Sequence, residues 1–326
     1  LYIYSLLHNT IGPVGQILCL EKEVLVLEKN RLLVLPSSAC FFSWGFPDNS
    51  CAFGNYATEK VCSVFEGLCD WGETLCAVCP NATTIITAGS STVVCVWEVA
   101  ISKDKLTHMR LRQPLYGHTD AVTCLAVSES HSLIVSGSLD LTCILWDLEE
   151  LSYVTQLVGH TSSISALAIN DLTGEIVSCA GPLLYLWTMK GQLLACTGTS
   201  SGPEADILCV TFTQRLEWDS RNVIVTGCAD GIIRVSSDGI IKWMHSLDES
   251  AGSASGQEKG WRRCLMLCGE LSRGPSLSQR RPNDSPAITA LAMSRYRADK
   301  LSADYVSAVA GCCDRHCYSY VWLVLF

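Results

Sequence analysis

Three side chains in the middle of the sequence have the types that a serine hydrolase uses: His118, Ser136 and Asp140. In such an enzyme the histidine takes the proton of the serine hydroxyl while the carboxylate orients the ring. The same groups can instead form a buried structural network, in which hydroxyl, ring and carboxylate hydrogen-bond to one another. Ser136 lies in an apolar run typical of a buried strand, so we favour the structural network over catalysis.

Two other segments hold residues that catalysis or metal binding needs. Ser200 lies in GTSSG at 198–202, which matches the G-x-S-x-G pattern of serine hydrolases, but Pro203 and an acidic stretch follow where a helix is required. Zinc-ligand residue types occur near the end of the chain without a second pair at zinc-finger spacing: Cys264, Cys268, Cys312, Cys313, His316 and Cys317. We therefore predict no catalytic residue, no metal and no cofactor. A serine or zinc hydrolase is the competing enzyme interpretation.

The composition limits the class of protein. The chain has 326 residues and a formal net charge of −9, which argues against a general nucleic-acid binder because phosphate contacts need clustered lysine and arginine. Most of the 19 cysteines lie in strand-like apolar runs, which indicates buried reduced thiols. Cys76 and Cys79 would point to opposite faces of one strand and make a poor metal site. The chain begins at Leu1 without a secretory signal, so we expect a fragment of a cytosolic protein.

The elements that would position these residues come from an internal repeat. AVTCLAVS at 121–128 recurs as SISALAIN at 163–170 and AITALAMS at 287–294. IVSG at 134–137 has counterparts at 85–88, 176–179 and 224–227, so the spacing is 42 to 49 residues. Apolar runs that end in tryptophan follow at 94–97, 143–146 and 184–187. These short, β-branched segments with polar turns predict a four-stranded unit that is repeated along the chain.

The spacing of two dipeptides resembles the WD40 repeat. Gly117-His118 is followed after 27 residues by Trp146-Asp147, and Gly159-His160 is followed after 26 residues by Trp187-Thr188. The resemblance implies an all-β, WD40-type β-propeller of about six to seven blades, with the last blade degenerate or incomplete. It also implies a network of His118, Ser136, Asp140 and Trp146 in one repeat.

Other repeats keep only part of this pattern. Gly181 stands where the second repeat should have its turn aspartate, and Ser236 stands at a tryptophan position. The remaining residues of the predicted structural network are Trp97, Asp147, His160, Ser178, Trp187, Thr226 and Asp230. The predicted segments are a divergent first blade or closing strands at 1–60, a degenerate blade at 61–100, WD40 repeats at 101–150 and 151–190, a degenerate repeat at 191–240, a disordered linker at 241–284, and a partial last blade with an aberrant tail at 285–326.

Longer strings are similar to a narrower family, the propellers of BEACH-domain proteins. These strings include PVGQILC at 13–19, FSWGFPDNSC at 42–51 and STVVCVWE at 91–98. The similarity is greatest to the WD-repeat- and FYVE-domain-containing branch, in a form without the FYVE finger. It implies a non-catalytic scaffold of vesicle traffic and selective autophagy, with endosomal handling of antigen as one role. The alternative is a WD40 adaptor of another complex, such as a substrate receptor of a ubiquitin ligase.

The resemblance also implies where partners bind. We expect protein partners from trafficking or autophagy, no nucleic acid, and only indirect association with membranes. We expect a cytoplasmic location at the periphery of endosomal or other intracellular membranes. The loops that carry the Gly-His pairs and the turn aspartate positions should share one face, since loops on a rigid scaffold commonly bind partners. We predict partner contacts there from Thr119, Leu139, Thr161 and Pro182.

Overall fold

The computed structural model describes the chain as β-strands joined by loops and turns. It describes residues 16–19, 24–27, 31–36, 40–46, 48–55, 60–65, 71–102, 105–198, 206–212, 224–229, 232–237, 240–246, 264–269, 288–297, 304–312 and 317–324. These residues contain strands β1 to β26 and no α-helix, which confirms the predicted all-β class. Within these residues there is no helix long and apolar enough to cross a membrane. The chain divides into one unit at 29–200 and another that combines 1–28 with 201–326.

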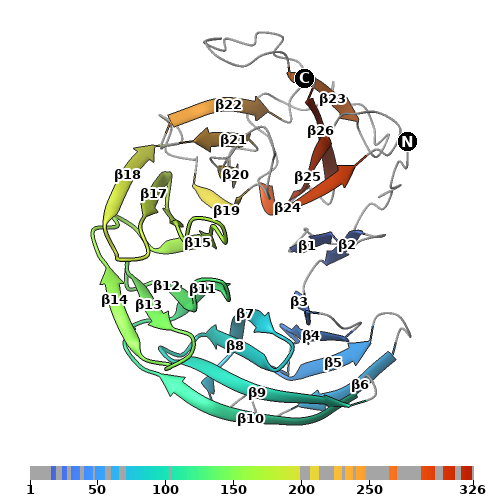
Figure 1. Cartoon of the computed structure of the whole chain (residues 1–326), viewed down its shortest axis with the longest axis vertical. Coiled ribbons are helices and arrows are strands. Elements are labelled where there is room, and N and C mark those ends of the chain that lie inside the picture. The colour runs from blue at the N-terminus through green and yellow to red at the C-terminus, as the bar shows by residue number, and fades with distance from the viewer. Residues whose placement is uncertain are drawn as a thin grey trace. The chain divides into compact units, whose positions relative to one another are not determined.

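The unit at 29–200 contains four antiparallel four-stranded sheets. Their strands are β3 (Arg31–Val34), β4 (Cys40–Trp44), β5 (Cys51–Asn55) and β6 (Lys60–Phe65); β7 (Thr74–Asn81), β8 (Thr84–Gly89), β9 (Val94–Ser102) and β10 (Lys105–Leu115); β11 (Val122–Ser128), β12 (Leu133–Ser138), β13 (Cys143–Asp147) and β14 (Tyr153–Leu157); and β15 (Ile164–Ile169), β16 (Ile176–Ala180), β17 (Leu183–Trp187) and β18 (Leu193–Gly198). In each sheet consecutive strands pair. The first strands β7, β11 and β15 lie side by side, and β10, β14 and β18 form the outer edges (Figure 1).

The central strands of the second and third sheets are buried on both faces, because each of these two sheets packs between two neighbours. Ile85 packs into the core with the first sheet, whereas Ile86 packs into the core with the third. Likewise Ile134 and Val135 enter two different cores. Successive side chains of a strand point to opposite faces, so burial of both faces requires a continuous apolar run rather than an alternating one. The repeated IVSG-type segments supply such runs, and this stacking of repeated sheets is the predicted propeller architecture.

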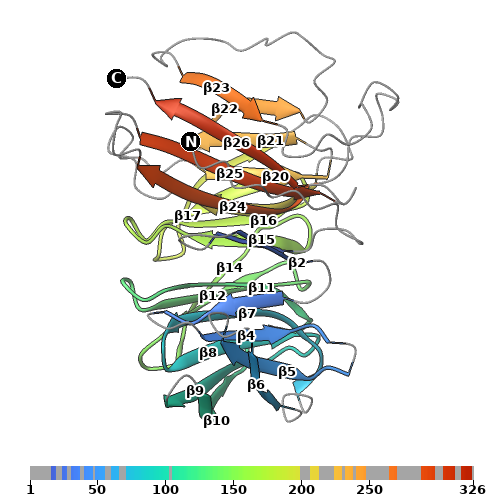
Figure 2. The same cartoon turned by 90° about the vertical axis from the view of Figure 1, so that its right-hand side faces the viewer.

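The second unit contains two four-stranded sheets and a two-stranded one among its described residues. The first joins β19 (Ile207–Phe212), β20 (Ile224–Cys228), β21 (Ile232–Ser237) and β22 (Ile240–Ser246) in chain order. The other has the order β23 (Cys264–Gly269), β26 (Cys317–Val324), β25 (Asp304–Cys312) and β24 (Ile288–Arg297), and Figure 2 shows β24, β25 and β26 side by side. The hairpin of β1 (Gln16–Cys19) and β2 (Val24–Leu27) lies with β1 against β24.

The sheets differ from the predicted segments in where they begin. The predicted repeats at 101–150 and 151–190 each include the outer strand of the preceding sheet, β10 or β14, and leave out the outer strand of their own sheet, β14 or β18. The predicted first segment at 1–60 divides between the two units. The predicted disordered linker at 241–284 contains most of β22 and all of β23. The predicted partial last blade at 285–326 supplies three strands that β23 completes to four.

Candidate interaction site

The structure brings His118, Ser136, Asp140 and Trp146 together in one hydrogen-bond chain. His118 Nδ1 lies 2.8 Å from Asp140 Oδ2, and His118 Nε2 lies 2.8 Å from Ser136 Oγ. The Trp146 indole N–H donates to Ser136 Oγ at 2.9 Å. His118 precedes β11, Ser136 lies in β12 and Trp146 lies in β13, so the chain of bonds ties a connecting loop to the two central strands of its sheet.

The geometry of this network fixes the direction of each bond. The Asp140 carboxylate only accepts, so His118 carries a proton on Nδ1, and in the neutral ring Nε2 is then an acceptor. Ser136 therefore donates its hydroxyl proton to Nε2 and accepts from the indole. Every side-chain polar atom of this hydrogen-bond network has a partner, as a buried network requires. Ser136 is fully buried, so its hydroxyl is not exposed to a dissolved substrate despite its catalytic-triad composition.

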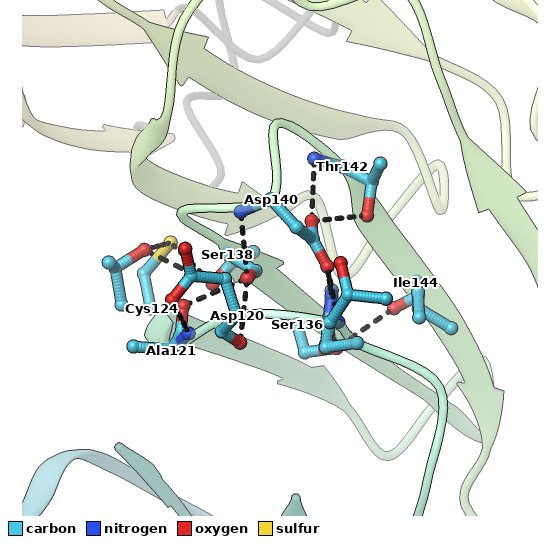
Figure 3. Close-up of polar contacts among 12 residues, drawn as sticks. Asp120, Ala121, Cys124, Ser136, Ser138, Asp140, Thr142 and Ile144 are labelled. Atoms are coloured by element: carbon cyan, nitrogen blue, oxygen red, sulfur yellow. Dashed lines mark hydrogen bonds and ion pairs between the residues drawn. The ribbon is translucent and has the colours of Figure 1, made fainter. Parts of the chain in front are cut away.

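The turn between β12 and β13 is built around Asp140 (Figure 3). Its Oδ1 accepts from the backbone N–H of Thr142 at 2.9 Å and from the Thr142 hydroxyl at 2.6 Å, and its Oδ2 also accepts from the Thr119 N–H at 3.0 Å. Burial opposes ionisation of Asp140, but the hydrogen bonds from Thr142, Thr119 and His118 outweigh it and lower the pKa of the carboxyl group. The ionised carboxylate thus holds two loops at the same end of the sheet.

The next sheet repeats the network without the carboxylate. His160 Nε2 lies 2.7 Å from Ser178 Oγ, and the Trp187 indole N–H donates to the same oxygen at 2.8 Å. The turn between β16 and β17 is the short pair Gly181-Pro182, with Gly181 at a φ of 57°, and it has no acidic residue. Burial lowers the pKa of His160, and the backbone carbonyl of Leu141 in the preceding turn opposes that effect.

Two further predicted networks are described only in part. The Trp97 indole N–H donates to Thr87 Oγ1 at 2.8 Å, which preserves the tryptophan–hydroxyl pair of the second sheet. In the sheet β19–β22, Ile224 pairs with Ser236 as Ile134 pairs with Trp146, so Ser236 does occupy the tryptophan position. Thr226 is buried in β20. Asp230 lies outside the described residues.

Asp147 has a different role from the histidine network. Its Oδ1 accepts the backbone N–H groups of Glu149 and Glu150, both at 2.8 Å, and so closes the turn between β13 and β14. Thr188, the residue after the next tryptophan, accepts from the N–H groups of Lys190 and Gln192 with its hydroxyl. The sequence analysis did not predict that these two residues close the turns. A short polar side chain two residues before a backbone N–H is the signal that indicates it.

The candidate enzyme and metal residues do not form a site in the described part of the chain. Cys76 packs with the core between the second and third sheets, whereas Cys79 packs with the core on the other side of its sheet. Burial raises the pKa of Cys79 to about 12, and burial also raises that of Cys76. Among the described residues no three His, Cys, Asp or Glu side chains gather to hold a metal ion. Ser200, Cys313 and His316 lie outside the described residues.

The predicted partner residues lie in loops at one end of the sheets. Thr119 follows β10, Leu139 follows β12, Thr161 follows β14 and Pro182 follows β16. Thr119, Leu139 and Thr161 are exposed, and Pro182 is half-buried. Reading the sequence did not single out three exposed apolar residues in the same loops: Tyr116, Leu141 and Val158.

Comparisons with known proteins agree with the repeat pattern. The family described as WD domain, G-beta repeat matches residues 109–147 and 194–235, and each match starts in an outer strand. The human WD repeat- and FYVE domain-containing protein 4 is 45% identical over 311 residues, which cover 93% of this chain and 10% of that protein. Protein SPIRRIG of Arabidopsis thaliana is 39% identical over 69% of this chain and 6% of its own length. The human Lysosomal-trafficking regulator is 30% identical over 61% of this chain and 5% of its own length. The chain spans a tenth or less of the length of these relatives.

Proposed function

Since this chain is a WD40-repeat member of the BEACH-domain protein family, we propose that it serves as a protein-interaction platform without catalysis of its own. The observation that carries this proposal is that buried side chains hold the exposed loops in place through hydrogen bonds at one end of the sheets. The Thr119 backbone is held by Asp140, which is itself held by His118 and Thr142. Exposed side chains on loops that are fixed from below suit recognition, because little ordering is needed on binding.

The proposal that the chain has no catalysis is supported by burial of the triad-like arrangement among the described residues. His118 and Ser136 are buried, and the serine hydroxyl is already committed to the imidazole and the indole. A nucleophile must instead reach the reacting atom of a substrate. We therefore assign the histidine networks to the stability of the sheets and the exposed loops to function.

The finer proposal is a scaffold of vesicle traffic and selective autophagy, with cytoplasmic location at the periphery of endosomal or other intracellular membranes. Support comes from relatives, one of which is named a lysosomal-trafficking regulator. Membrane association would be indirect, through protein partners.

Affinity purification tests this proposal. The full chain would be expressed with a tag in cells, and its partners would be compared with those of a Thr119→Asp/Thr161→Asp variant. We expect trafficking or autophagy proteins that bind the wild-type chain and are lost from the variant at an unchanged melting temperature. Recovery of ubiquitin-ligase subunits in their place would favour the adaptor alternative. Identical partners for both proteins would contradict the use of these loops.

A further inference from the structure

Large apolar side chains are exposed in three loops at one end of the unit at 29–200. Their exposed fractions are 65% for Tyr116, 44% for Leu139, 42% for Leu141 and 62% for Val158. Tyr116 belongs to the loop at 116–121, Leu139 and Leu141 to the turn at 139–142, and Val158 to the loop at 158–163. We call these four residues the apolar loop cluster.

Contacts between the three loops place the cluster at a common end of two adjacent sheets. The Leu139 N–H donates to the Ala121 carbonyl at 2.9 Å, and the Thr119 N–H donates to Asp140. The Leu141 carbonyl is close enough to the His160 ring to oppose the lowering of its pKa by burial. His160 lies two residues after Val158. The turn at 139–142 therefore lies between the other two loops and contacts both.

Leu141 adopts a backbone conformation that its side chain does not favour. Its φ is 68°, in the left-handed region, where glycine and asparagine are the usual residues. Leu151 has a similar φ of 53°, but its side chain is buried in the core between two sheets, so packing accounts for it. Leu141 is 42% exposed, and its turn is held instead by hydrogen bonds from Thr142 to Asp140 and from the Ser138 N–H to the Thr142 carbonyl. The turn therefore keeps the Leu141 side chain at the surface, where a partner can contact it.

The charges of the three loops indicate the chemistry of the occupant. The loops contain Asp120 and Asp140 and no lysine or arginine. Both oxygens of Asp140 already bond to His118, Thr119 and Thr142, whereas Asp120 is exposed and can meet a cation of a partner. An apolar surface with negative charge is complementary to apolar side chains that are accompanied by positive charge.

We propose that the apolar loop cluster binds a segment of a partner protein in which large apolar side chains stand beside lysine or arginine. This deepens the proposed function, on which it rests, by naming the chemistry of the partner. The apolar side chains of that segment would cover Leu141 and its three neighbours, and its cations would lie near Asp120. Tyr116 would supply a large contact area at a low entropic cost, as aromatic side chains do at interfaces.

Selection of short random peptides on the immobilised full chain tests the proposal. We expect the selected peptides to be enriched in large apolar residues next to lysine or arginine. A labelled synthetic peptide of the consensus sequence would then be titrated by fluorescence anisotropy. Its affinity should fall steadily as sodium chloride is raised from about 0.05 M to about 0.5 M, because exposed charges are screened.

Two variants and two matched controls locate the binding surface. Leu141→Gly should weaken the peptide by about tenfold or more, as loss of an interface anchor does, while the melting temperature stays at or above that of the wild type. Tyr116→Ser should weaken it similarly. The controls Leu172→Ala and Val154→Ser remove exposed apolar side chains elsewhere, and we expect them to change the affinity by less than about twofold.

Three outcomes would overturn the proposal: selected peptides rich in acidic residues, no selected peptides, or unchanged affinity in Leu141→Gly. If any of these occurred while cellular partners were still lost from the Thr119→Asp/Thr161→Asp variant, the interaction platform would stand and only the partner chemistry would fail. If those partners were also unaffected by the variant, both proposals would fail.

Discussion

In two adjacent sheets a histidine at the same position is held by different polar groups. In β11–β14, His118 is fixed by Asp140 on one side and Ser136 on the other. In β15–β18, His160 keeps the serine and the tryptophan but faces a Gly-Pro turn instead of a carboxylate. The comparison shows that the hydroxyl–indole pair inside the sheet persists when the turn changes. The carboxylate belongs to the loops, and in the sheet that lacks it burial lowers the pKa of His160.

In the second of the two sheets the histidine ring also packs against two aromatic rings. The His160 ring lies 4.6 Å from the Tyr185 ring and 5.3 Å from the Trp187 ring, centroid to centroid. Tyr185 occupies the strand position that Ile144 has in the sheet before it, as the pairing with Ser178 and Ser136 shows. The histidine of β15–β18 thus contacts aromatic rings and has no carboxylate in the adjacent turn.

The largest expected loss of stability follows from removing the buried tryptophan, which occupies the same strand position in both sheets. Trp146→Ala should lower the free energy of unfolding by about 3–5 kcal/mol, because it empties a buried site and removes the donor to Ser136. Urea unfolding followed by circular dichroism measures this loss. Tyr153→Ala, at an exposed aromatic beside Trp146, is the control and should cost much less. Equal losses would show that Trp146 is not a core residue.

Removal of the carboxylate tests the difference between the sheets directly. Asp140→Ala should cost about 2–3 kcal/mol, because it leaves donors of His118, Thr119 and Thr142 without their charged acceptor. The pKa of Asp140 is lowered on folding, so its ionisation stabilises the fold above the ordinary value of 3.8, and this contribution is lost as the pH falls below it. Pro182→Ala, in the corresponding turn, should cost less than about 1 kcal/mol. Similar losses in thermal unfolding would contradict the distinction.

The pH dependence of stability sharpens the same comparison at a smaller scale. The pKa of His160 is lowered on folding from an ordinary value of 6.5, so the unfolded chain binds this proton more readily than the folded one. Stability should therefore fall as the pH decreases through 6.5 toward the folded value.

A substitution at the ring identifies the source of this slope. Urea unfolding between about pH 7.5 and pH 5.5 should show a smaller loss of stability for His160→Gln than for the wild type, since the titrating group is absent. The amide of glutamine can still bond to Ser178, which limits other damage. An identical slope in the two proteins would assign the pH dependence to other groups.

The smallest expected effect concerns the residue after the tryptophan. Asp147→Ala should cost about 0.5–1.5 kcal/mol, because two backbone N–H groups in an exposed turn would exchange their acceptor for water. Thr188→Ala should cost less, since its hydroxyl accepts at 3.3 and 3.2 Å rather than 2.8 Å. Differential scanning fluorimetry can rank the two variants. A larger loss in Thr188→Ala would reverse the assignment.

The contacts of residues within a repeat can be predicted well from the sequence. The spacing from His118 to Trp146 indicated the network, because each partner is local and of an unusual type. The strand at 264–269 was missed because CLMLCG is short, lies between Ser- and Gly-rich stretches, and pairs with residues of β26 that are 50 to 60 positions later. The conformation of Leu141 was also missed, since leucine gives no signal for a positive φ.

The displaced start of each sheet has a consequence for trimming the chain. A fragment that ends at Asp147 would complete the matched repeat at 109–147 but would leave β13 without its outer neighbour β14. Its exposed edge would carry the unpaired backbone groups of Cys143, Ile144 and Leu145, and an apolar edge of this kind recruits other chains. Fragments intended to remain monomeric should therefore end after an outer strand, such as at Val158, and not after a tryptophan pair.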